Sequence, residues 1–92
     1  MRRTVKKRGR RKVIRTWRVN MKATGLELRQ RCVKEGFEPK VLSEWFGVAL
    51  TTPYMWFNGE AMPKLNTLVT LAKVLHCKVD DLLIVEEEED DE

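Results

Sequence analysis

Apolar side chains recur three and four residues apart through the middle of this chain. From residue 65 to residue 75 the positions with this spacing are Leu65, Leu68, Leu71, Ala72 and Leu75. A second stripe, after residue 39, consists of Val41, Leu42, Trp45 and Phe46. Such spacing places apolar side chains on one face of an α-helix, where they pack against a core. The middle of the chain is therefore predicted to be helical.

Capping and terminating residues predict where the first two helices lie. Thr24 and Glu27 have the spacing of a capping box, so the first helix is expected over about residues 25–35, with a glycine directly after it. Pro39 suits the first position of a second helix, because no amide donor is needed there. Gly47 is expected to end that helix.

A third, shorter helix is predicted over about residues 51–57. Pro53 lacks an amide hydrogen and is tolerated only in the first turn of a helix, so the helix must begin just before it. Either Thr51 or Thr52 is expected to cap its N-terminus. The helix is expected to end before Gly59.

Two further helices complete the expected fold. The fourth covers about residues 65–75, and the fifth is short and led by Asp80 and Asp81, whose charge is favourable at a helix N-terminus. Aromatic residues expected to pack in the core are Trp45, Trp56 and Phe57. Five short helices with short connections predict an all-α fold, a compact five-helix bundle.

Charge is distributed unevenly along the 92 residues, although the net charge is only +4. Residues 1–22 contain eleven basic and no acidic residues, and residues 86–92 are all acidic. The region between them is neutral. Dense blocks of like charge repel themselves and are typical of disordered interaction tails. We therefore expect a flexible basic arm over 1–22, a folded domain over 23–85 and a disordered acidic tail over 86–92.

The end of the basic arm also fits a β-strand. The residues that would share one side of it are Val13, Arg15, Trp17 and Val19. This segment is either a strand that adds to a partner or part of the flexible arm. Met21 is a natural start for the folded domain, so the arm is alternatively an upstream extension.

Few residues carry catalytic or metal-binding chemistry. Cys32 and Cys77 lie in apolar surroundings and are expected to be buried free thiols. His76, the only histidine, is expected at or near the surface and lacks the companions that a zinc site needs. With no glycine-rich phosphate loop and no carboxylate cluster in the core, we expect no enzyme activity, no cofactor and no metal. No apolar run approaches membrane-spanning length, so we expect a cytoplasmic protein.

Four stretches of the chain match the pattern of one family. They are TGLELRQRCVKEG, VLSEWFGV, WFNG and MPKLNTLVTLAKVLHCKVDDLL. In this order they resemble the first helix, the second helix with its turn, the end of the recognition helix, and the fourth and fifth helices of the phage-repressor-like (lambda repressor and Xre type) helix-turn-helix DNA-binding family. The resemblance covers about residues 24–83. It implies a nucleoid-associated transcriptional regulator that binds double-stranded DNA as a homodimer.

The resemblance also implies which residues contact DNA. In this family the third helix lies in the major groove, and the N-terminus of the second helix contacts phosphates. The positions that would face the bases are Leu50, Thr51, Thr52, Tyr54, Met55 and Asn58. The positions that would face phosphates are Pro39, Lys40 and the backbone around Gly59. Contacts implied for the basic arm, on phosphates or in the minor groove, are made by Lys6, Lys7, Arg8, Arg10, Arg11 and Lys12.

The chain departs from the family at the positions that read bases. Between Val48 and Phe57 it has no Arg, Lys, Gln or Asn, the side chains whose bidentate base contacts are worth about 1–3 kcal/mol each. Hydroxyl and apolar side chains remain, and they favour a preference for A·T pairs over a fully specified operator. Leu50, Tyr54 and Met55 leave a second interpretation open: a protein-interaction module, antitoxin-like or a phage regulatory partner, whose third helix binds protein.

The charged ends of the chain leave two further possibilities open. Arginine-rich arms also bind RNA, so an RNA-binding variant is compatible with the arm. The acidic tail would compete with DNA for the arm, as an electrostatic brake that weakens with salt. Removing residues 86–92 is then expected to tighten DNA binding at low salt.

Overall fold

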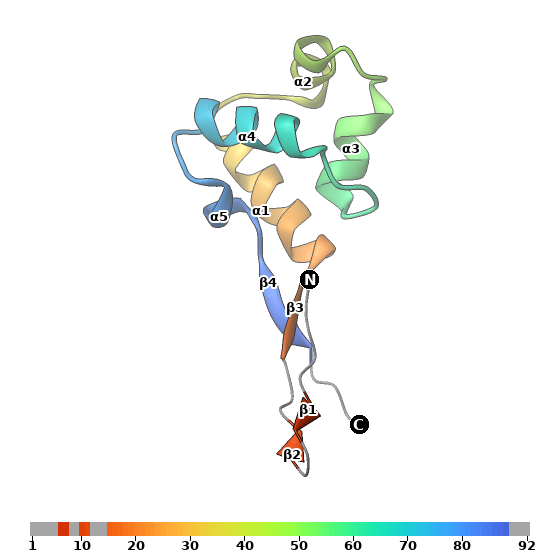
Figure 1. Cartoon of the computed structure of the whole chain (residues 1–92). Helices are drawn as coiled ribbons and strands as arrows, with labels where there is room; N and C mark the ends of the chain where they lie inside the picture. Colours follow the sequence, from red (N-terminus) through yellow and green to blue (C-terminus); the bar gives the residue numbers. More distant parts are fainter. Residues whose placement is uncertain (1–5, 8–9, 12–14, 89–92) are drawn as a thin grey trace.

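The computed structural model describes residues 6–7, 10–11 and 15–88 (Figure 1). Its helices are α1 (Met21–Lys34), α2 (Pro39–Phe46), α3 (Thr51–Asn58), α4 (Leu65–Val74) and α5 (Val79–Leu82). Its strands form two antiparallel pairs, β1 (Lys6–Lys7) with β2 (Arg10–Arg11) and β3 (Thr16–Val19) with β4 (Val85–Glu88). The prediction of five helices is confirmed. The expected all-α fold holds for the helical domain but not for the described residues outside it, which form these small sheets.

The first helix begins one turn earlier than the sequence predicts. Asn20 is its N-cap, and the Asn20 side chain accepts a hydrogen bond from the Ala23 amide at 2.9 Å. The predicted capping box of Thr24 with Glu27 is therefore wrong, because another side chain already caps the helix upstream. Glu27 instead accepts a hydrogen bond from Arg31 at 2.7 Å, one turn further along α1.

The core is formed mainly by apolar side chains of α1, α3 and α4. Its buried members are Leu28, Cys32, Leu42, Trp56, Phe57, Leu68, Leu71, Ala72, Leu75 and Leu82. Trp56 and Phe57 thus pack in the core, as the sequence predicts. Leu65 does not, although it belongs to the expected stripe, and it is 71% exposed. It is the first residue of α4 and lies ahead of the turn that carries Leu68 into the core.

The backbones of α1 and α3 are in direct contact. A Cβ atom on Gly25 would lie 2.5 Å from the carbonyl oxygen of Trp56 and 2.7 Å from that of Phe57. Where the same two helices meet again, a Cβ atom on Gly59 would lie 2.7 Å from the Cα atom of Lys22. Non-bonded atoms do not pack at such distances, so the absence of a side chain at both glycines permits this contact.

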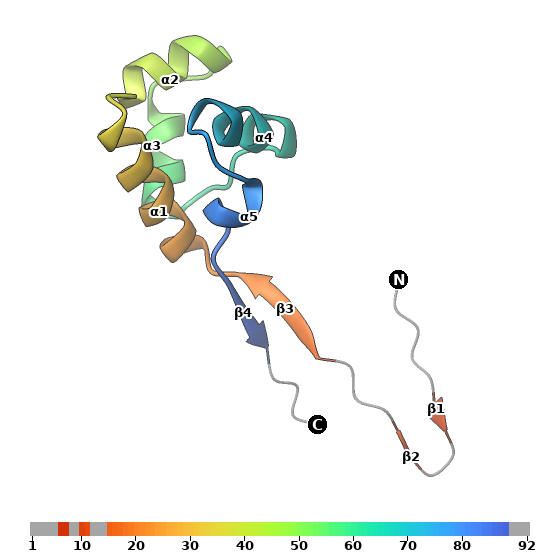
Figure 2. The ribbon, with the colours of Figure 1, turned by 90° about the vertical axis from the view of Figure 1, so that its left-hand side faces the viewer.

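The β3–β4 ribbon brings together segments from the two ends of the chain. In its register Trp17 lies opposite Glu87, and Val19 lies opposite Val85. Figures 1 and 2 show the ribbon projecting from the helical bundle beside the start of α1. Residues 86–88, expected in a disordered tail, therefore lie in a strand. Of the two interpretations of the arm segment, the strand fits Thr16–Val19, and its partner strand comes from the same chain.

A buried threonine ties β4 to the first helix. The Thr24 hydroxyl accepts a hydrogen bond from the Ile84 amide at 2.9 Å and donates to the Ile84 carbonyl oxygen at 3.5 Å. The same carbonyl oxygen accepts a hydrogen bond from the Asn20 amide at 2.7 Å. The segment that leaves α5 is thereby held against the residues that begin α1.

We expect Gly25→Ala to destabilise the fold by about 3 kcal/mol, the upper part of the range for overpacked cores. In an unobstructed helix the same change would stabilise by about 0.5–1 kcal/mol, so the sign itself is informative. Urea denaturation measures the difference in the free energy of unfolding.

The matched control is Gly36→Ala. Gly36 has a φ of 79° and no atom within 4 Å of its Cβ position, so the cost there is conformational only, about 1–2 kcal/mol. A Gly25→Ala protein as stable as the wild type would show that α1 and α3 do not meet in this way.

We expect Thr24→Val to cost about 1–3 kcal/mol, because the Ile84 amide loses the hydrogen-bond acceptor that it has in this partly buried contact. Thr24→Ser keeps the hydroxyl and is the control, with a smaller loss that reflects only the missing methyl group. Hydrogen exchange of the β4 amides should accelerate in the valine variant and much less in the serine variant. Equal exchange rates in the two variants would contradict the role of the hydroxyl.

Candidate nucleic-acid interface

The α2 and α3 helices are joined by a tight turn that begins with a glycine. Gly47 has a φ of 63°, in the left-handed region, and it ends α2. The Val48 amide donates a hydrogen bond to the Ser43 carbonyl oxygen at 3.0 Å, and the Val48 side chain packs against the core. The two helices form the helix-turn-helix that the sequence predicts.

The N-terminus of α3 is not capped as expected. Leu50 occupies the N-cap position and makes no side-chain hydrogen bond, so the expectation that Thr51 or Thr52 caps the helix is wrong. The Thr52 amide instead donates to the Ala49 carbonyl oxygen at 3.0 Å, within the turn. Pro53 lies in the first turn of α3, where proline is tolerated.

The α3 helix has one buried face and one exposed face. Its buried residues are Pro53, Trp56 and Phe57. The Trp56 ring meets that of Phe46 edge to face, with ring centroids 6.0 Å apart. Of the predicted base-facing residues, those that are exposed are Leu50, Thr51, Tyr54, Met55 and Asn58, while Thr52 is half-buried. The structure thus brings these residues together along the outer side of α3, and their contact with DNA stays a prediction.

Two lysines are exposed on the helices that pack against α3. Lys40 is exposed in the first turn of α2, at one of the predicted phosphate-facing positions beside Pro39. Lys22, which the sequence analysis did not single out, is exposed in the first turn of α1. The Lys22 backbone lies against Gly59, at the C-terminal end of α3. No local signal marks Lys22, because only the packing of α1 on α3 brings it there.

The predicted arm contacts fall partly within the described residues. Lys6 and Lys7 lie in β1, and Arg10 and Arg11 lie in β2, which pairs with it. Arg8 and Lys12 lie outside the described residues.

Ion pairs join the end of the basic arm to β4. Arg15 contacts Glu87 at 2.7 Å, and Arg18 contacts Glu86 at 2.9 Å and Glu88 at 3.8 Å. These pairs are exposed, so each contributes about 0–1 kcal/mol and is weakened by salt. Attraction between the arm and the tail is expected from their opposite charges, and the register of the ribbon determines which residues meet.

Trp45 does not pack in the core as expected. It is 50% exposed, and its ring meets that of Phe37 edge to face with centroids 5.0 Å apart. Periodicity placed Trp45 on the same stripe as Leu42, which is fully buried. The α2 helix is short, and the Trp45 ring packs on Phe37, a residue of the segment that precedes α2. It therefore does not reach the leucine core.

In the described residues, the thiols and the polar side chains have structural roles and do not form a reactive or metal-binding site. Burial of Cys32, with a smaller effect of the neighbouring Cys77, raises the Cys32 pKa to about 11, so the thiol is neutral and unreactive. In the described part of the chain, no three His, Cys, Asp or Glu side chains gather as metal ligands.

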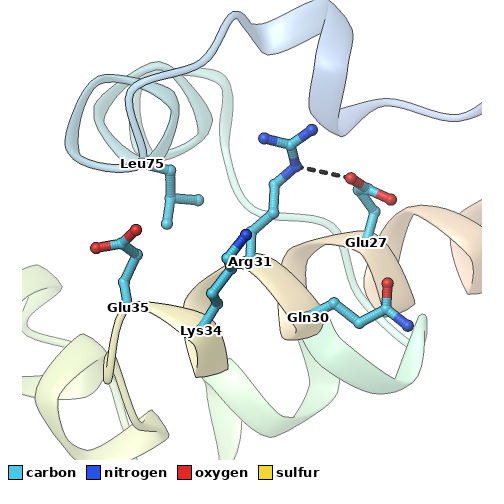
Figure 3. Close-up of a pocket in the computed structure, with 6 residues that line it drawn as sticks. All are labelled: Glu27, Gln30, Arg31, Lys34, Glu35 and Leu75. Atoms are coloured by element: carbon cyan, nitrogen blue, oxygen red, sulfur yellow. Dashed lines mark hydrogen bonds and ion pairs between the residues drawn. The ribbon is translucent and has the colours of Figure 1, made fainter.

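One open groove runs along α1 beside Leu75, where Glu27 and Arg31 bind each other (Figure 3). Lys34 and Glu35 also line it, a composition typical of a solvated helix face. Among the helices that the structure describes, none is long and apolar enough to cross a membrane.

Comparison with known proteins identifies the family. The family model of the Cro/C1-type HTH DNA-binding domain matches residues 27–88. The match runs from within α1, through the turn between α2 and α3, to the end of β4. No curated protein and no solved structure matches the chain. Since the matched residues make up more than half of the 92, the chain belongs to the family of Cro/C1-type HTH DNA-binding domains.

Proposed function

We propose that this chain is a transcriptional regulator that docks α3 in the major groove of double-stranded DNA and holds the phosphates with basic residues around it. The observation that carries this proposal is the exposed face of α3. Leu50 is 51% exposed and Tyr54 is 52% exposed, while Trp56 behind them is 5% exposed. A helix held rigidly by its inner face can present its outer face to a groove wide enough to admit it.

The side chains on this face allow only modest base discrimination. The Thr51 hydroxyl can exchange hydrogen bonds with base edges, and Leu50 and Met55 can contact thymine methyl groups. None of these side chains forms the bidentate pairs that arginine forms with guanine. We therefore propose that α3 docks by shape, with a preference for A·T pairs.

The basic residues supply the attraction that α3 lacks. Each neutralised phosphate releases counterions, and this effect dominates non-specific affinity for DNA. Lys22 and Lys40 lie near opposite ends of the helix-turn-helix, close to where the α3 and α2 backbones would meet the phosphates. The arm residues from Lys6 to Lys12 extend the contact to phosphates or to the minor groove.

A homodimer is the form in which we propose that the chain binds. Two copies related by a two-fold axis would place their α3 helices on half-sites about one helical turn apart, roughly 34–36 Å. Pairing of two weakly discriminating helices doubles the number of bases that are read.

The second candidate function is a protein-interaction module, and one observation favours it. Leu50, Tyr54 and Met55 are all exposed along α3, which makes this face more apolar than a DNA-reading helix requires. Contiguous exposed apolar side chains are typical of protein interfaces. The two functions differ in whether the purified chain selects a DNA sequence.

We expect the full chain to enrich an A·T-containing motif from a random duplex library at low salt. Replacing Tyr54 and Met55 with alanine should abolish the motif while leaving non-specific affinity, because the phosphate contacts survive.

Replacing the six basic residues from Lys6 to Lys12 with glutamine should weaken binding to all sequences. The slope of log affinity against log salt should then fall by about 0.9 for each phosphate contact that is lost.

Gln30→Ala, at an exposed position of α1 in the groove beside Leu75, is the control and should bind like the wild type. An unchanged motif in the Tyr54 and Met55 variant would refute base contact by α3. A chain that binds no duplex at any salt concentration would favour the protein-interaction module.

We expect replacement of Glu86, Glu87 and Glu88 with glutamine to tighten DNA binding several-fold at low salt. Arg15 and Arg18 lose their carboxylate partners and become available to phosphates. The difference should disappear at about 0.5 M salt, where the Debye length is only a few ångströms. Substitution is preferable to truncation, because removing residues 86–92 also removes most of β4.

The control for net charge removes three acidic groups elsewhere, with Glu35→Gln, Glu44→Gln and Asp80→Asn, all of them exposed residues. If these substitutions tighten binding as much as those in β4, total charge explains the effect and the ion pairs of the ribbon do not.

A further inference from the structure

The β3–β4 ribbon determines where the basic arm leaves the folded part of the chain. The basic residues from Lys6 to Lys12 precede β3 in the sequence. Because every residue of β3 is paired with β4, the fixed end of the arm is Thr16 and not Asn20, which caps α1. The ribbon thus moves the start of the arm away from the helices by about 13 Å, the length of four extended residues.

The root of the ribbon lies beside the C-terminal end of α3. Val19 is the last residue of β3, and two positions later the Met21 carbonyl oxygen lies 2.9 Å from the Cβ position of Gly59, which ends α3. Figures 1 and 2 both show the ribbon leaving the bundle at the end opposite α2. The ribbon therefore continues beyond the end of the face that we propose docks on DNA.

Contacts at the root fix the direction of the ribbon. The Ile84 carbonyl oxygen accepts a hydrogen bond from the Asn20 amide at 2.7 Å, and the Ile84 amide donates to the buried Thr24 hydroxyl at 2.9 Å. Further along the strands, Arg18 contacts Glu86 at 2.9 Å. A segment that is already ordered by such contacts loses little entropy when the arm beyond it binds.

The charges of the ribbon suit it to separate two DNA contacts and not to make one. Its arginines, Arg15 and Arg18, are paired with glutamates, and β4 carries three acidic residues in a row. The ribbon therefore has no excess positive charge for a phosphate backbone to attract. Basic residues lie on either side of it, Lys22 at its root and those from Lys6 to Lys12 ahead of it in the chain.

We propose that the ribbon is a rigid spacer that places the basic arm in the minor groove next to the major groove that α3 occupies. The proposal rests on the docking of α3 under the proposed function. A helical turn of about 34 Å separates successive major grooves, so the minor groove between them lies roughly 17 Å along the duplex. A spacer of about 13 Å that starts beside the end of α3 spans most of that distance. A narrow minor groove has a strong negative potential, which attracts arginine and lysine side chains.

Alternation along the ribbon identifies the positioning residues, whose amides hold the spacer together. The Asn20 amide binds the carbonyl oxygen of Ile84, which lies opposite it in the register. Bonded and non-bonded pairs alternate in an antiparallel ladder, so Arg18 and Glu86 form a bonded pair. Glu87 is in a non-bonded pair, and its amide therefore faces away from β3.

Proline substitutions in β4 separate the pairing of the strands from their charge. Glu86→Pro removes an amide that bonds to β3, whereas Glu87→Pro removes an amide at the open edge, where proline is tolerated. Each variant also loses one carboxylate that is paired with an arginine, so the two are matched in charge. Circular dichroism should show intact helices in both, and hydrogen exchange should show an open ribbon only in Glu86→Pro.

Hydroxyl-radical footprinting on the duplex that the wild-type chain selects measures where the arm lies. The wild type and Glu87→Pro should protect the α3 site and, at a fixed offset, the adjacent minor groove. Glu86→Pro should keep the α3 protection, but its minor-groove protection should spread along the duplex. Its affinity should fall about threefold, because the tether from Lys12 then ends at Asn20 instead of Thr16, which doubles its length.

A milder variant keeps the test decisive if Glu86→Pro does not fold. Glu88→Pro breaks only the pair with Thr16, at the far end of the ribbon from the Thr24 contact, and should also spread the minor-groove protection, to a smaller extent. Protection that is absent in the wild type, or equally sharp in Glu88→Pro and Glu87→Pro, would overturn the spacer and leave the role of α3 intact. A wild-type chain that selects no duplex would instead refute the proposed function, and the spacer with it.

Discussion

The position of α3 depends on the contact between two backbones. Gly25 lets α1 approach the carbonyl oxygens at the end of α3, and Gly59 lets the end of α3 approach the start of α1. Since no side chain lies between the helices there, the orientation of α3 follows from main-chain geometry and not from adaptable packing. The exposed row from Leu50 to Asn58 is rigidly displayed as a result, and Lys22 is brought beside it. A face that reads a groove by shape benefits from such rigidity, because ordering it on binding costs little entropy.

The helical part of the fold is predictable from local signals. Apolar spacing, Pro39, Gly47 and Pro53 place α2, α3 and α4 within a residue or two of where they lie. The start of α1 is not predictable in this way, because Asn20 and Thr24 are both good capping residues. The choice depends on Ile84, which uses the Thr24 hydroxyl for its own hydrogen bonds. A contact between residues sixty positions apart leaves no mark in a local pattern. Trp45 shows the same limit of prediction. Its spacing correctly indicates a helix, but the burial of its side chain depends on which residues pack against that face of α2.

The candidate site, too, is only partly predictable from the sequence. The exposed face of α3 is predictable because the helix-turn-helix repeats a known order of buried and exposed positions. The ribbon is not, because the charge blocks that form it indicate disorder when each is considered alone. Together they offer paired strands, with Arg15 and Arg18 beside Glu86 and Glu87. Blocks of opposite charge on either side of a folded domain can neutralise each other once the domain brings them together.

The tie between Thr24 and Ile84 has a consequence for synthesis on the ribosome. The strand Thr16–Val19 leaves the exit tunnel before the five helices, whereas the strand that pairs with it follows them. During that interval the helices can form from local contacts, which close quickly, but the pairing of the two ends has a large sequence separation and must wait. The nascent basic segment is therefore unpaired and most attractive to nearby polyanions, such as ribosomal RNA, until residues 85–88 arrive.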